Sequence, residues 1–110
     1  RANMPGTWSV ATDLTKPLTL VEGLQQGAGE GVKILYAKGS NVIRDEEQER
    51  YARMFGRDIP RDGRTDKQLL DEALAAAAEA DVVVAALGEA SEMSGESSSR
   101  SQIGIPDVQQ

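Results

Sequence analysis

The sequence predicts an α/β fold: a doubly wound, mostly parallel sheet of the Rossmann-like sandwich type, present only in part. Three observations support this class. They are two short apolar runs typical of buried strands, a helix directly before the second run, and the order helix, strand, excursion, helix, strand, helix start. A strand, helix and strand in this order require the right-handed crossover of a parallel sheet. Because two strands make a poor sheet, the chain is expected to hold only part of a domain.

The first half of the chain is predicted to form one helix and one strand. Pro17 suits the first turn of a helix, and Leu20 and Leu24 share one face of it. Residues 27–31 (GAGEG) superficially resemble a nucleotide-binding loop, but such a loop must follow a strand and open a helix. This one follows a helix, so it is interpreted as a helix terminator. Residues 32–37 (VKILYA) are the predicted strand.

A polar stretch over residues 39–64 separates this strand from the next helix. It mixes acids and arginines, which is typical of a solvated helix-and-loop excursion rather than of a basic patch. Tyr51, Met54 and Phe55 have helical spacing and are expected to pin part of the excursion to the body of the domain.

The second helix and strand form the most regular part of the sequence. Thr65 and Gln68 have the spacing of a capping box, and the helix that they open, over residues 66–80, carries leucines and alanines on one side. Residues 81–87 (DVVVAAL) follow without alternation, as a strand covered on both faces requires. Pro106 is expected to begin a further helix.

Composition excludes several classes of function. The 110 residues carry a net charge of −6, which repels nucleic acid and anionic membrane surfaces. No apolar run approaches the roughly 20 residues that cross a bilayer. The chain has neither cysteine nor histidine, so it lacks thiolate and imidazole groups for metal binding or proton transfer. No metal or cofactor is expected, and any proton chemistry falls to Asp, Glu, Lys or Tyr.

The candidate chemistry lies in the loop over residues 88–102, which follows the second predicted strand and holds Glu89, Glu92 and Glu96. In parallel α/β sheets, ligands gather at the carboxyl ends of strands. A carboxyl group that donates a proton near neutral pH needs a raised pKa, which burial or a neighbouring negative charge supplies. The same composition is also typical of a mobile surface loop. Residues 38–41 (KGSN), after the first strand, are similarly either a functional edge or a polar turn.

The landmarks of this loop resemble a known family. Residues 88–90 (GEA), Met93, residues 95–100 (GESSSR) and an Ile-x-Ile-Pro ending at Pro106 follow one another in order. They are similar to the C-terminal α/β-sandwich domain of glycoside hydrolase family 3, in its bacterial periplasmic β-glucosidase branch.

Two upstream segments carry the same resemblance. Residues 4–9 (MPGTWS) resemble the Gly-x-Trp-Ser segment of that branch, and residues 35–41 (LYAKGSN) resemble its strand ending in Ala-Lys-Gly-x-Asn. The similarity thus covers nearly the whole chain in the order of the family. Residues 42–64 depart from the family in length and composition.

The resemblance implies a role for one glutamate. Enzymes of this family retain anomeric configuration, with an Asp nucleophile in a preceding barrel domain and, in many members, an acid/base Glu from this second domain. The residue that matches that Glu is Glu96, and retaining chemistry places the two carboxyl groups about 5–5.5 Å apart. Glu89 is then expected to be structural or to support a neighbouring residue. Arg100 either pairs with a loop carboxylate or is a surface residue.

Residues 1–110 are accordingly expected to be part of a C-terminal α/β-sandwich domain without its catalytic barrel. The resemblance implies a β-glucoside or oligosaccharide substrate, the barrel of the same polypeptide as a partner, a periplasmic or secreted location and no cofactor. The fragment alone is expected to be inactive, and exposed sheet edges would allow it to self-associate. The alternative is a non-catalytic module that binds a sugar or another small ligand.

Overall fold

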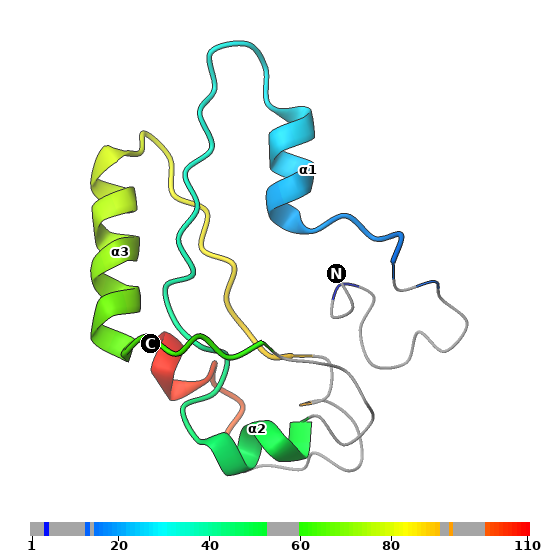
Figure 1. The fold of residues 1–110 in the computed structure, drawn as a ribbon, viewed down its shortest axis with the longest axis vertical. Coiled ribbons are helices and arrows are strands. Elements are labelled where there is room, and N and C mark those ends of the chain that lie inside the picture. The colour runs from blue at the N-terminus through cyan, green and yellow to red at the C-terminus, as the bar shows by residue number, and fades with distance from the viewer. Residues whose placement is uncertain (1–3, 5–12, 14, 53–59, 91–92, 94–100) are drawn as a thin grey trace.

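The computed structural model describes residues 4, 13, 15–52, 60–90, 93 and 101–110. Within these ranges the helices are α1 (Leu20–Gly27), α2 (Glu46–Ala52), α3 (Asp66–Glu79) and a 3-10 helix, η2 (Asp107–Gln109). In Figure 1, α1 and α3 stand on opposite sides of two long segments that are neither helix nor strand, residues 28–45 and 80–90. No helix in the described ranges has the length and apolar character needed to cross a membrane.

Helix α1 begins at Leu20, three residues after the predicted start at Pro17, and it ends where the sequence indicates. The Thr19 hydroxyl accepts a hydrogen bond from the Glu22 backbone N–H at 3.2 Å, and the Glu22 carboxylate accepts one from the Thr19 N–H at 2.7 Å. This capping box satisfies two backbone donors at the start of the helix. The helix ends at Gly27, and Ala28 has extended backbone. The interpretation of residues 27–31 as a helix terminator is therefore confirmed.

Helix α3 is capped as predicted. The Thr65 hydroxyl accepts from the Gln68 backbone N–H at 3.2 Å, and the Gln68 side chain accepts from the Thr65 N–H at 2.9 Å. The predicted apolar face is covered only in part. Leu69 is fully buried, whereas Leu70 and Leu74 are 53% and 59% exposed.

The prediction of a parallel sheet is wrong for the described part of the chain. Residues 32–37 and 82–87, the expected strands, have no strand conformation, and no backbone hydrogen bond joins one segment to the other. Both segments run in the same direction in Figure 1. Helix 66–80 therefore has no sheet face to pack on, although the helix itself forms.

The physical reason is that an apolar run indicates suitability for burial, whereas a strand needs a neighbour to complete its hydrogen-bond ladder. Here the run is uncovered, since Val82, Val83 and Val84 are 78%, 62% and 61% exposed. Two segments of this kind do not bury enough surface to hold a sheet. The expected self-association likewise has no sheet edge among the described residues to act through.

Besides Leu69 of α3, the described residues have an apolar cluster that joins the ends of the two long segments. Ile43, at the end of the first, and Ala90, at the end of the second, are each 6% exposed. They pack together, with Val42 and Met93 partly buried against them. This cluster therefore lies where the candidate functional segments begin.

The two remaining elements follow the sequence in outline. Helix α2 lies inside the predicted excursion over residues 39–64, and η2 begins directly after Pro106. The latter is a single 3-10 turn rather than the start of an α-helix. The expected anchoring by Tyr51, Met54 and Phe55 concerns side chains outside the described part of the structure.

Candidate functional site

The ends of the two long segments line one hollow of about 1040 Å³. Its lining includes Lys38 and Gly39 from the first segment, Gly88 and Glu89 from the second, and Gln109 from η2. The structure thus brings together the two segments that the sequence singles out, residues 38–41 and the start of the loop over residues 88–102, although no sheet holds them.

Gln109 ties these two segment ends together through its side-chain amide. Its Oε1 accepts from the Gly88 N–H at 2.8 Å, and its Nε2 donates to the Gly88 carbonyl at 2.9 Å and to the Val42 carbonyl at 3.1 Å. Gly88 has a φ of 132°, a conformation that residues with side chains rarely adopt. The amide therefore fixes a sharp change of direction at the point where the candidate loop begins.

Residues 38–44 and 60–66, which we call the neck, close the excursion that contains α2. Asn41 is 3% exposed and fastens the two sides of the neck. Its Oδ1 accepts from the Asp62 N–H at 2.8 Å, and its Nδ2 donates to the Asp62 carbonyl at 3.1 Å. Lys38 Nζ donates to Asn41 Oδ1 at 3.0 Å and to the Pro60 carbonyl at 3.1 Å. Lys38 and Asn41 therefore act here as structural clamps.

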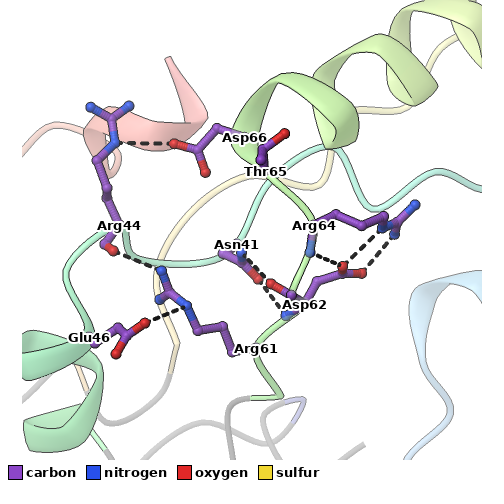
Figure 2. A pocket seen from close by; sticks show the side chains of 9 residues that line it. Asn41, Arg44, Glu46, Arg61, Asp62, Arg64, Thr65 and Asp66 are labelled. Carbon is purple, nitrogen blue, oxygen red and sulfur yellow. Dashed lines mark hydrogen bonds and ion pairs between the residues drawn. The ribbon is translucent and has the colours of Figure 1, made fainter.

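A second clamp in the neck is built around Arg61. Its guanidinium donates to the carbonyls of Ile43 at 3.3 Å and Arg44 at 3.0 Å. It also donates to Glu49 of α2 at 2.7 Å, and that carboxylate is 3% exposed. Figure 2 shows the Arg61 side chain turned toward the Arg44 carbonyl and the Glu46 carboxylate. One guanidinium thus holds both α2 and the adjoining backbone.

A smaller hollow of about 450 Å³ in the neck is lined by charges of both signs (Figure 2). Its arginines each pair with an acid of the same lining: Arg44 with Asp66, Arg61 with Glu46, and Arg64 with Asp62. Hydrogen bonds from the side chain and backbone of Arg64 lower the pKa of Asp62, and the same side-chain contact raises the pKa of Arg64. The hydrogen bond to Glu49 raises the pKa of Arg61. Because the charges compensate one another, this hollow suits cohesion of the neck rather than capture of a charged ligand.

Asp62, Asp66 and Glu46, the acids that line the smaller hollow, are thus placed beside arginines. Across the ranges that the structure describes, no group of three acidic side chains is arranged to hold a metal ion. Glu89 is exposed at the rim of the larger hollow. The predicted acid/base residue Glu96 lies outside the described residues, as do Glu92 and Arg100. The role of Glu96 therefore stays a prediction.

Three side chains that organise this region carry little sequence signal: Asn41, Arg61 and Gln109. Asn41 lies in a segment that the sequence marks for its place after an apolar run, and Arg61 is one of many arginines in a mixed-charge stretch. Gln109 has no signal beyond following Pro106. A polar side chain that bonds to distant backbone carbonyls leaves no periodic pattern, because its partners are set by the fold.

Comparisons of the sequence with known proteins place this chain in a family. The profile of the Glycosyl hydrolase family 3 C-terminal domain matches residues 1–110. The periplasmic beta-glucosidase of Salmonella typhimurium (strain LT2) is 40% identical over 104 residues, which are 94% of this chain. The chain spans 14% of the length of that relative. The resemblance seen in the sequence is confirmed, and the chain belongs to the glycosyl hydrolase family 3 C-terminal domain family.

Proposed function

We propose that this chain supplies the general acid/base glutamate, Glu96, of a retaining β-glucosidase whose nucleophile lies in another domain of the same polypeptide. The observation that carries the proposal is the family match over residues 1–110. The 40% identity to a periplasmic beta-glucosidase supports the same activity. Glu96 is the residue that matches the acid/base position within the landmark over residues 95–100.

In this role Glu96 protonates the glycosidic oxygen as it leaves. It then takes a proton from the water that hydrolyses the glycosyl-enzyme. The two carboxyl groups of a retaining site stand about 5–5.5 Å apart, and Glu96 is one of them. The other, an Asp nucleophile, comes from the barrel domain. On this proposal residues 1–110 are part of the second domain, and the 110-residue chain alone does not hydrolyse a β-glucoside.

The base of the loop supports this role. Gly88 is held by Gln109, and Glu89 follows it at the rim of the larger hollow. Catalytic side chains need a rigid support to stay within the productive geometry. A loop that leaves a fixed point can present Glu96 to a site in a neighbouring domain, with Glu89 remaining at the base.

The proposed substrate is a β-glucoside or an oligosaccharide with a terminal β-D-glucosyl residue, and the proposed location is the periplasm or the cell exterior. Both proposals follow from the name of the relative. Retaining hydrolysis is completed by two carboxyl groups and a water molecule, so the proposal includes no cofactor.

The test is a series of leaving groups measured on the full-length protein with Glu96→Gln. Loss of the proton donor should lower kcat/KM by on the order of 10²–10⁴ for poor leaving groups. Activated aryl glucosides should be affected far less, because their leaving group departs without protonation. Azide should partly restore the rate, since a small anion can attack the glycosyl-enzyme in place of activated water.

Glu89→Gln and Glu92→Gln are the matched controls from the same loop. If one of them shows both effects while Glu96→Gln behaves as wild type, the acid has been assigned to the wrong glutamate. If none of the three does, the acid lies outside this loop. The alternative function, a non-catalytic module for a sugar or small ligand, predicts binding without turnover and no barrel nucleophile in the full-length sequence.

A further inference from the structure

We propose that Gln109 is the positioning residue of the acid-bearing loop. Its amide sets the direction in which the chain leaves Gly88, and so governs how well the proton donor farther along the loop reaches the leaving oxygen. The inference rests on the proposed function, because it requires a proton donor in the loop over residues 88–102. Gln109 acts through the loop backbone and is given no contact with the substrate.

The first observation is the reach of the Gln109 amide. Its hydrogen bonds to Gly88 span 21 residues, and its hydrogen bond to Val42 spans 67 residues. All of these partners are backbone groups, so the amide holds the path of the chain itself. Both donor hydrogens of Nε2 are used, one on each of the two long segments. One side chain thereby fixes the end of the second segment against the end of the first.

The second observation is the backbone of Gly88. Its φ of 132° lies in a region open to glycine, and glycine has many alternative conformations. Beyond its chain neighbours, no atom lies within 4 Å of the place where a Cβ of residue 88 would stand, so close contacts at this position do not enforce the conformation. The Gln109 amide holds both the N–H and the carbonyl of Gly88, and rotation away from the observed conformation breaks at least one of these bonds. The amide therefore restrains the direction of exit at Gly88 itself.

The third observation is a fixed point just beyond Gly88. Ala90 is 6% exposed and packs against Ile43. A change of direction at Gly88 must then either pull Ala90 from this contact or be transmitted along the rest of the loop. General acids work within about 2.6–3.2 Å of the atom that they protonate. A misplacement of about 1 Å can lower the rate by about 100-fold. Loss of the Gln109 hydrogen bonds to Gly88 is therefore expected to slow proton transfer to the leaving oxygen.

The test substitutes Gln109→Met in the full-length protein, because Met keeps a similar length and lacks the amide. We would measure kcat/KM for an alkyl β-glucoside, which needs proton donation, and for a dinitrophenyl β-glucoside, which does not. Both values come from one preparation, so their ratio cancels the amount of folded enzyme. A merely structural role would leave the ratio unchanged. We expect the ratio of alkyl to dinitrophenyl substrate to fall about tenfold.

Gln110→Met is the matched control. Gln110 is the neighbouring residue and is exposed, and its Nε2 donates to the Ile105 carbonyl at 3.0 Å, within its own segment. The ratio should stay at the wild-type value in this variant. If Gln110→Met lowers the ratio as much as Gln109→Met does, the effect belongs to the whole turn and the inference is overturned.

The remaining outcomes separate this inference from the proposed function. An unchanged ratio in Gln109→Met overturns the inference, whatever Glu96→Gln shows. A lowered ratio supports it. If Glu96→Gln then keeps the wild-type ratio, Gln109 still positions the loop and only the assignment of the donor fails. If Gln109→Met gives no active enzyme, the same ratio of kcat/KM values is measured for Gly88→Ala, which disturbs the backbone of residue 88 while leaving the Gln109 amide in place. A lowered ratio supports the inference, and an unchanged ratio overturns it.

Discussion

The neck and the two apolar segments, residues 32–37 and 82–87, are held in opposite ways. In the neck, polar side chains bond to backbone groups about 20 residues away, and Asn41 is 3% exposed. Along the apolar segments, Val32 and Val82 are 58% and 78% exposed, and no backbone hydrogen bond joins the two runs. The polar region of this chain is thus the better packed one.

The difference reflects two kinds of interaction. Hydrogen bonds are directional, and a clamp such as Asn41 is complete once its few partners are present. Hydrophobic stabilisation is not directional and grows with the area removed from water. The neck supplies hydrogen-bond partners for each of its clamps, whereas the described residues do not supply the surface that would cover the valines. Polar contacts therefore set the local geometry of the neck and of Gly88, where the candidate loop begins.

The largest expected effect tests where apolar burial stabilises the chain. Leu69→Ala should lower the free energy of unfolding by about 2–5 kcal/mol, because this side chain is fully buried. Val83→Ala should change it by less than about 0.5 kcal/mol, because Val83 is 62% exposed. Urea unfolding followed by the helical circular-dichroism signal measures both values. Similar losses of stability in the two variants would mean that the apolar segments are covered in solution. The contrast between the well-packed neck and the exposed apolar segments would then be wrong.

The next effect tests the polar side of the comparison. Asn41→Ala should lower the free energy of unfolding by about 1–3 kcal/mol, because it leaves the partly buried backbone N–H and carbonyl of Asp62 without their partner. The amide hydrogen of Asp62 should also exchange faster with solvent. Gln25→Ala, on the exposed surface of α1, is the control and should stay within about 0.5 kcal/mol of wild type. No change in either measurement for Asn41→Ala would show that the neck does not depend on this clamp.

What the sequence predicts well are features whose partners lie a few residues apart. The capping box at Thr65 closes on a residue three positions later, so its spacing is visible in the sequence. The end of α1 at Gly27 is visible for the same reason. The strands are the opposite case, because residues 32–37 and 82–87 have the composition of strands but the pairing depends on neighbours that composition does not report.

The candidate site divides in the same way. The sequence singles out residues 38–41 and the loop over residues 88–102 from their place after apolar runs. Residues 38–41 and the start of that loop, residues 88–90, line the larger hollow, although the described residues form no sheet. The amide that joins them, Gln109, could not be predicted, because its partners lie 21 and 67 residues away. The family landmark over residues 95–100 points to Glu96, which lies outside the described residues, so its role stays a prediction.

The smallest expected effect concerns pH and sharpens the account of the neck. Hydrogen bonds from the Arg64 side chain and backbone lower the pKa of Asp62 below its ordinary value of 3.8. The unfolded chain therefore takes up a proton at Asp62 at a higher pH than the folded chain does. The stabilisation from this group is complete above 3.8 and is lost as the pH falls toward the folded-state pKa.

The measurement is the free energy of unfolding between about pH 5 and about pH 2. It should decline on the acid side, and both Asp62→Asn and Arg64→Gln should flatten that decline, because either change removes the contact that separates the two pKa values. Solvent screening keeps the effect small, since the Arg64 side chain is 43% exposed. If the decline keeps its full slope in both variants, its source is another carboxylate. The structure of the neck at low pH would then depend on the Asn41 amide, which does not titrate, and on the hydrogen bonds from Arg61 to backbone carbonyls.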